Sequence, residues 1–222
     1  MKKVFEHFWK SILLLACMLF CGVCIDGLSA QTCEGRICLK DGARLLYMGH
    51  DRIEMPRKKR DVLAYRDFFS SKCKRDTIAV GRIDSVVVWN TAAPQYARVL
   101  VPIDNVGWCW AYVCHPKLQV YIYSSQGYSL NSMGGMKAWQ GNTAAAMFLI
   151  PSKTACDFYV LQPGNTPVCL GDVYKKCDKA FVRKLCHIAG VGAAWEQKLL
   201  DSGEVNRSSM VLKVVEILDS QQ

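Results

Sequence analysis

Short apolar segments separated by turn residues recur from Thr77 to Gln162, and this spacing is the feature that most constrains the fold. The segments are TIAVGRIDSVVVWN, YARVLVPI, VGWCWAYVC, LQVYIYS, TAAAMFLIP and CDFYVLQP. Gly, Pro, Asn or Ser lies between most of them, which predicts an antiparallel β-sandwich or barrel-like sheet. Because no glycine-rich phosphate loop follows any of these segments, the sequence argues against a nucleotide ligand.

The region before these strands is predicted to hold two more strands and one helix. Ala43–Met48 and Arg52–Met55 flank the residues GHD, which suggest a hairpin turn. Apolar residues such as Val62 and Phe69 then fall at helical spacing, so we expect a short amphipathic helix over Arg57–Phe69. Residues 31–163 would together form a β-rich domain.

Residues 164–222 differ in composition and are predicted to be a helical C-terminal segment. The stretch VYKKCDKAFVRKLCHIAGV favours a basic amphipathic helix that ends near Gly190. AAWEQKLLDSG favours a second helix, closed by Gly203. SSMVLKVVEIL favours a third helix, with Ser208 or Ser209 as its N-cap. The predicted fold class is therefore α+β, with two to three C-terminal helices.

The first thirty residues resemble a secretory signal peptide in their layout. Lysines precede an apolar run from Ser11 to Ile25, and small residues follow it, so cleavage is expected between Ala30 and Gln31. A membrane span is disfavoured because the run is shorter than the ~20 residues that cross a bilayer. Lipidation at Cys17 is a further alternative. The chain would stay at a membrane only if it were lipidated there or if the leader were not cleaved. We therefore expect export to the periplasm, the cell envelope or the extracellular space.

Export makes disulfide bonds an expectation for the mature chain. Nine cysteines follow the leader: Cys33, Cys38, Cys73, Cys109, Cys114, Cys156, Cys169, Cys177 and Cys186. Since nine is odd, at least one thiol stays free or pairs between molecules. We expect two to four bridges, and the alternative is a set of buried, inert thiols.

Cysteine and histidine lie close together in the stretch GWCWAYVCHP, which suggests a haem attachment site at first sight. That motif has two residues between its cysteines, whereas four separate Cys109 from Cys114. The intervening residues favour a strand, which would place Cys109 on one face and Trp108, Trp110 and Cys114 on the other. No haem or shared disulfide is then expected there.

The sequence also argues against a zinc site and a hydrolytic site. Cys169, Cys177, Cys186 and His187 are spaced too widely for a structural zinc site, so no metal or other cofactor is predicted. Beyond the leader, the histidines are His50, His115 and His187, and no nucleophile–base signature accompanies them. A small secreted enzyme, such as a Cys/His hydrolase, remains the alternative function.

The candidate binding residues are aromatic and basic. Alternation along LQVYIYS suggests that Tyr121 and Tyr123 face outward, and a platform with Tyr128 and Trp139 could bind a glycan or peptide. The alternative is that these rings pack beneath the helical segment.

The basic run RKKR comprises Arg57, Lys58, Lys59 and Arg60. It fits a proprotein-processing site, an anion-binding patch or the solvated end of a helix. The formal charge of +9 falls to +8 without the leader, because its three lysines outweigh Glu6 and Asp26. Such a balance suits an acidic partner. The leading hypothesis is an exported, non-catalytic envelope or secreted protein that acts through contacts with a protein, a glycan or an anionic surface.

Overall fold

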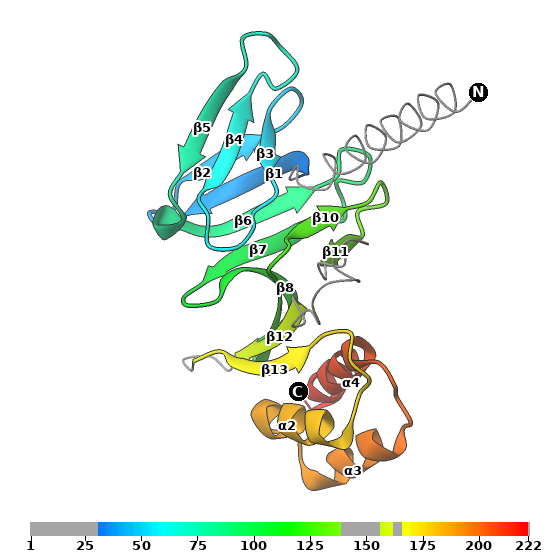
Figure 1. Ribbon diagram of the computed structural model, residues 1–222. Helices are drawn as coiled ribbons and strands as arrows, with labels where there is room; N and C mark the ends of the chain where they lie inside the picture. The colour runs from blue at the N-terminus through cyan, green and yellow to red at the C-terminus, as the bar shows by residue number, and fades with distance from the viewer. Residues whose placement is uncertain (1–30, 139–155, 162–165, 222) are drawn as a thin grey trace, which may run out of the picture. The chain divides into compact units, whose positions relative to one another are not determined.

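The computed structural model describes residues 31–138, 156–161 and 166–221. The predicted leader at 1–30, Trp139 and the segment TAAAMFLIP lie outside these ranges. Figure 1 shows the strands coloured from blue to yellow along the chain and the three C-terminal helices in orange and red. The α+β prediction, with a mostly antiparallel sheet and C-terminal helices, is confirmed.

Within the described residues, eleven strands form one antiparallel sheet in the order β13-β12-β9-β8-β7-β6-β1-β3-β4-β5, and β2 also pairs with β1. Their bounds are β1 Thr32–Leu39, β2 Arg44–Tyr47, β3 Arg52–Glu54, β4 Val62–Arg66, β5 Lys74–Ile78, β6 Ile83–Trp89, β7 Arg98–Ile103, β8 Gly107–His115, β9 Leu118–Ser124, β12 Cys156–Leu161 and β13 Val168–Asp172. The strands predicted at YARVLVPI, VGWCWAYVC, LQVYIYS and CDFYVLQP correspond to β7, β8, β9 and β12.

Strand β1 pairs along both of its edges, which overturns the predicted hairpin around GHD. One edge pairs with β6. On the other edge, Thr32 and Cys33 pair with β3, and residues 35–38 pair with β2. Gly35 lies opposite Tyr47, and Cys33 lies opposite Ile53. Strands β2 and β3 therefore run in the same direction and pair with successive parts of one edge of β1. The residues between them form a break in that pairing and do not form a hairpin turn.

The helix predicted over Arg57–Phe69 is wrong, because Val62–Arg66 forms strand β4. It pairs with β3 on one side and with β5 on the other. The side chains of Val62 and Ala64 are buried, and those of Leu63 and Tyr65 are half-buried, which is the period of a strand. Backbone hydrogen bonds to two neighbouring strands determine this conformation, and they override the helical spacing of a few apolar residues.

A row of side chains on one face of the sheet forms the centre of the core. The row follows the register across six strands: Ile37, Val86, Leu100, Trp110, Ile122 and Phe158. All but the half-buried Trp110 are buried, and each large apolar side chain contributes about 1.5–3 kcal/mol through burial. Phe158 packs on Phe181, with the ring centroids 6.2 Å apart. Phe181 belongs to helix α2, Lys179–Ala189, which therefore covers this face of the core.

The three helices are α2 Lys179–Ala189, α3 Ala193–Asp201 and α4 Arg207–Ser220. The first begins after Asp178, whose carboxylate accepts a hydrogen bond from the Phe181 amide at 2.8 Å, and it ends at Gly190 in the left-handed conformation. Asn206, rather than Ser208 or Ser209, is the N-cap residue of α4. The segment assigned to helices also contains β13, whose pairing with β12 was not predicted.

Arg207 joins the last helix to the sheet and to the first helix. Its guanidinium donates to the carbonyls of Leu170 at 3.3 Å and Asp172 at 3.0 Å, and it pairs with the Asp178 carboxylate at 3.3 Å. It also lies 4.5 Å from the ring centroid of Phe181. Because the side chain is 7% exposed, these contacts replace water at the two terminal nitrogens, whereas Nε is buried without a hydrogen-bond partner among the described residues.

Residues 125–138, which follow β9, contain a small hairpin. Strands β10, Tyr128–Leu130, and β11, Met136–Ala138, pair in antiparallel fashion. The side chains of Tyr128, Leu130 and Ala138 are buried in the core, so this segment is structural.

Candidate functional site

The basic run forms a tight turn between β3 and β4. The Arg60 amide donates to the Arg57 carbonyl at 3.3 Å, and Lys58 adopts a positive φ of 57°. Lys58, Lys59 and Arg60 are exposed, whereas Arg57 is half-buried and pairs with Glu54 at 3.4 Å. We call Arg57–Arg60 the basic turn. Three of its four cations face solvent, and none lies on a helix.

Trp108 fixes the basic turn to the start of β8. Its backbone amide donates to the Lys58 carbonyl at 2.7 Å, and its indole nitrogen donates to the Arg60 carbonyl at 2.9 Å. The Trp108 side chain is fully buried. The backbone of the turn is therefore tied to the sheet at two points, which limits the conformations that its cations can take.

Gly107 allows the basic turn to lie next to a tyrosine. A Cβ atom at residue 107 would overlap the Lys58 carbonyl oxygen and would lie 3.3 Å from Cε2 of Tyr123. The φ of Gly107 is +125°, a conformation that disfavours other residues. The structure thus brings together two of the sequence candidates, the basic turn and Tyr123, through a glycine that sequence reasoning did not single out.

Tyr159 is a further aromatic residue at this site, and it was missed in the sequence. It lies opposite Tyr121 in the β9–β12 register, and its ring meets that of Tyr123 edge-on with centroids 6.3 Å apart. Tyr123 and Tyr159 are both half-buried. The alternation in CDFYVL, read beside that in LQVYIYS, was the available signal. We call the sheet face that carries Tyr121, Tyr123 and Tyr159 the tyrosine face.

The tyrosines are uncharged at neutral pH, and burial raises their pKa values further above it. Burial raises the pKa of Tyr159 to about 12, and it also raises that of Tyr123. Neutral phenols can donate hydrogen bonds to an anion and do not repel it. The chemistry of this face is therefore compatible with the positive charge of the basic turn.

Two of the predicted platform residues are buried, which corrects their assignment as contact residues. Tyr121 is 9% exposed, and its hydroxyl donates to the Gln119 side chain at 2.7 Å. Tyr128 is 4% exposed, and its hydroxyl lies within 2.8 Å of the Trp108 and Ile122 carbonyls. Tyr128 supports strands β8 and β9 from within the core. Trp139 lies outside the described residues.

The expected disulfide bonds do not form in this structure, and the nine cysteines among the described residues are free thiols. Several behave as small buried residues instead: burial raises the pKa of Cys33, Cys109 and Cys156 to about 12. At neutral pH these thiols are protonated and therefore poor nucleophiles.

A β-bulge at Tyr112 corrects the predicted faces of β8. Ala111 lies opposite Tyr121 and Val113 lies opposite Val120, so Tyr112 has no partner of its own in the ladder. Cys114 then lies opposite Gln119, on the same face as Cys109 rather than on the face of Trp108. Both thiols act electrostatically on Tyr121, in agreement with this placement.

His115 does not form the base of a thiol dyad with its neighbour Cys114. Its Nδ1 atom accepts a hydrogen bond from the Lys117 amide at 3.1 Å, and its Nε2 atom lies 3.3 Å from a carboxylate oxygen of Asp219. Both ring nitrogens thus face partners other than the thiol, and the ring joins the end of β8 to α4. This geometry gives no support to a catalytic dyad of Cys114 and His115.

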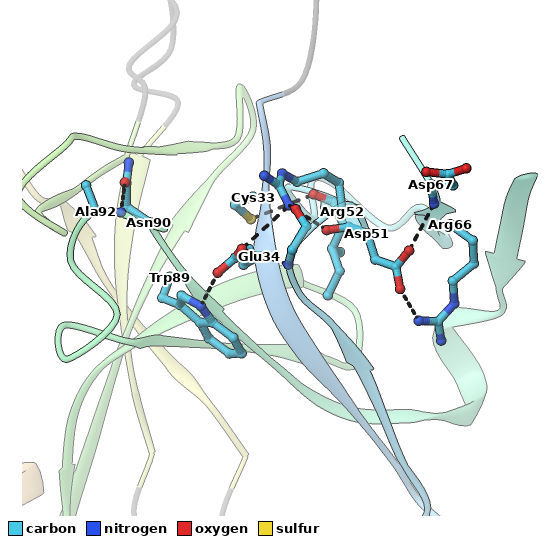
Figure 2. A network of polar contacts seen from close by, with 11 residues as sticks. Cys33, Glu34, Asp51, Arg52, Arg66, Asp67, Trp89, Asn90 and Ala92 are labelled. Carbon is cyan, nitrogen blue, oxygen red and sulfur yellow. Dashed lines mark hydrogen bonds and ion pairs between the residues drawn. The ribbon is translucent and has the colours of Figure 1, made fainter. Parts of the chain in front are cut away.

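A second cluster of polar contacts surrounds the start of β1 (Figure 2). The Glu34 carboxylate accepts hydrogen bonds from the Trp89 indole at 2.9 Å and the Gly49 amide at 3.0 Å, and it lies 3.6 Å from Arg52. Asp51 accepts from the Asp67 amide at 2.9 Å, and with Arg66 this bond lowers the pKa of the Asp51 carboxyl. Since both carboxylates have protein partners, we assign the cluster to folding rather than to ligand binding.

No protein-family model, curated protein sequence or solved structure matches this chain. Across the described ranges, no helix is both long enough and apolar enough to span a bilayer. The same ranges contain no group of three or more potential metal ligands. The basic turn and the adjoining tyrosine face are therefore the arrangement on which a function can be argued.

Proposed function

We propose that the protein is an exported, non-catalytic binding protein whose basic turn, together with Tyr123 and Tyr159 of the tyrosine face, contacts an anionic glycan. The observation that carries this proposal is the approach of the Lys58 backbone to the Tyr123 ring across Gly107. A basic turn whose backbone borders an aromatic face suits an acidic sugar polymer, because aromatic rings can stack on sugar faces and cations can pair with acidic groups.

The rigidity of the basic turn supports this proposal. The two hydrogen bonds from Trp108 fix the backbone before any ligand arrives, which lowers the entropy lost on binding. Because Lys58, Lys59 and Arg60 are exposed, their attraction for an anion should be screened by salt over about 8 Å at physiological ionic strength.

Titration calorimetry of the mature chain with heparin and with neutral dextran tests the proposal. We expect heparin to bind, neutral dextran to bind far more weakly, and added salt to weaken the heparin complex. The triple variant Lys58→Ala, Lys59→Ala, Arg60→Ala should lose at least about tenfold in affinity, and Tyr123→Ala should lose less.

A matched control removes three exposed cations elsewhere, through Lys72→Ala, Lys74→Ala and Arg75→Ala. This variant should retain most of the affinity. Equal losses of heparin affinity in the two triple variants would show that only net charge matters, and this result would contradict the proposed surface.

Export is proposed from the layout of residues 1–30, and N-terminal sequencing of the processed protein tests it. The mature chain should begin at Gln31 and should be recovered outside the cytoplasm. A protein recovered in the cytoplasm with Met1 intact would contradict this part of the proposal.

A further inference from the structure

A cavity of about 710 Å³, open to solvent, lies on the helical segment, apart from the basic turn. It is bounded by the chain before α2, by the end of α3, by the turn after it and by the start of α4. Binding sites for small organic molecules range from about 300 to 1,000 Å³, so this cavity has the size of such a site.

The deeper lining of the cavity is apolar. Val182, Leu199 and Met210 are buried, and Leu200 is half-buried. Val205 also lines the cavity and is 51% exposed. An apolar ligand group would remove this surface from water at a gain of about 25 cal/mol per Å².

Backbone pairing keeps one wall of the cavity in place. The Cys177 amide donates to the Val205 carbonyl at 2.8 Å, and Lys176 forms an antiparallel bridge with Asn206. The segment that carries the lysines is therefore fixed to the segment that carries Val205, and the cavity needs no rearrangement to form.

The charges around the cavity favour an anion. Its two carboxylates already have cationic partners: Asp178 pairs with Arg207, and Glu204 pairs with Lys213, each at 3.3 Å. Lys175, Lys176 and Lys179 also line the cavity and are exposed, and none of them forms an ion pair within the described part of the chain. An apolar interior with a cationic margin complements a molecule that has an apolar body and an anionic head.

We propose that this cavity binds a single-chain amphiphilic anion, with the acyl or alkyl chain against Leu199 and Val205 and a carboxylate or phosphate head beside Lys176 and Lys179. This site shares no residue with the glycan surface proposed above, so either proposal can fail without the other. Lys175 also acts electrostatically on Asp157, so the test relies on the other two lysines.

Titration calorimetry of the mature chain with four probes, each below its micellar concentration, tests the site. Dodecanoate and dodecyl phosphate represent the two head groups, dodecyl maltoside carries the same chain without charge, and inorganic phosphate carries the charge without a chain. We expect the two anionic amphiphiles to bind and the other two probes to bind at least about tenfold more weakly. Equal affinity for the maltoside or for phosphate alone would overturn the proposal.

Variants locate the site. Lys176→Gln with Lys179→Gln should weaken dodecanoate binding by about tenfold, and Val205→Asp should abolish it by placing a charge at the apolar lining. Both changes are at exposed residues, and urea unfolding checks that the variants remain folded.

Lys72→Gln with Lys74→Gln removes the same charge outside the cavity and should leave the affinity unchanged. The triple variant of the basic turn should also bind dodecanoate normally, which separates this site from the glycan surface. Wild-type affinity in both cavity variants would show that dodecanoate binds elsewhere and would overturn the proposal.

Discussion

The indole nitrogen of Trp108 donates a hydrogen bond to the carbonyl of Arg60 at 2.9 Å, across 48 residues of sequence. Trp108→Phe would remove this bond and leave space around the smaller ring in a fully buried position. We expect a loss of about 2 kcal/mol in the free energy of unfolding, measured by urea denaturation. Trypsin should also cut the basic turn faster in this variant. An unchanged cutting rate would show that the indole does not restrain the turn.

Gly107→Ala tests the close approach of the basic turn to β8. The added methyl group would overlap the Lys58 carbonyl at a backbone conformation that already disfavours alanine. We expect a destabilisation of at least about 2 kcal/mol and weaker heparin binding. Gly81→Ala is the control, because a Cβ atom there meets nothing within 4 Å, and its unfolding free energy should stay within about 0.5 kcal/mol of wild type.

Arg207→Met should destabilise the protein by about 2–4 kcal/mol. Methionine retains much of the apolar length of the side chain but leaves the carbonyls of Leu170 and Asp172 without their donor. Thermal unfolding monitored by circular dichroism measures the effect. If the Arg207→Met protein melts at the wild-type temperature, the guanidinium contacts contribute nothing net to stability.

The stability of the protein should depend on Asp178 at acidic pH. The hydrogen bond from the Phe181 amide and the nearby Arg207 lower the pKa of this carboxyl in the folded state. A lowered folded-state pKa contributes stability above the unfolded-state value of about 3.9, and that contribution is lost as the pH falls further. Asp178→Asn keeps a capping side chain without the charge, so the variant should be less stable at pH 7 and should approach wild type near pH 2.

Urea unfolding from pH 2 to pH 7 measures this dependence. Asp84→Asn is the control, because Asp84 is exposed and its carboxylate contacts the neighbouring Ser85 hydroxyl. This substitution should change the unfolding free energy by less than about 0.5 kcal/mol. A constant gap between wild type and Asp178→Asn across the whole pH range would contradict the linkage.

The thiols should differ widely in reactivity. Cys73, Cys114 and Cys169 are exposed and should be alkylated by iodoacetamide in the native protein at pH 8. Cys33, Cys109 and Cys156 should react only after unfolding, because burial shields them and raises their pKa to about 12. Peptide mapping by mass spectrometry distinguishes the two groups, and a disulfide-linked peptide before reduction would contradict the free-thiol state.

Local patterns in the sequence predict the central strands well, because β8 and β9 combine aromatic or β-branched residues with flanking turns. They fail at Val62–Arg66, where pairing with β3 and β5 determines the conformation. The residues of this segment alone do not reveal which strands will pair with it. The candidate site is predicted in part for a similar reason. The basic turn and Tyr123 are each recognisable in the sequence, whereas their proximity depends on Gly107 and Trp108.

The bulge at Tyr112 has a consequence for how β8 tolerates changes in length. Because Tyr112 has no partner in the ladder, a chain that lacks this residue would keep Ala111 opposite Tyr121 and Val113 opposite Val120. A deletion at residue 112 would therefore leave Cys114 and His115 on the faces that they occupy now. The main loss would be the packing of the Tyr112 ring against Trp110 and Phe158. The strand can thus lose one residue at this point without exchanging its interior and exterior.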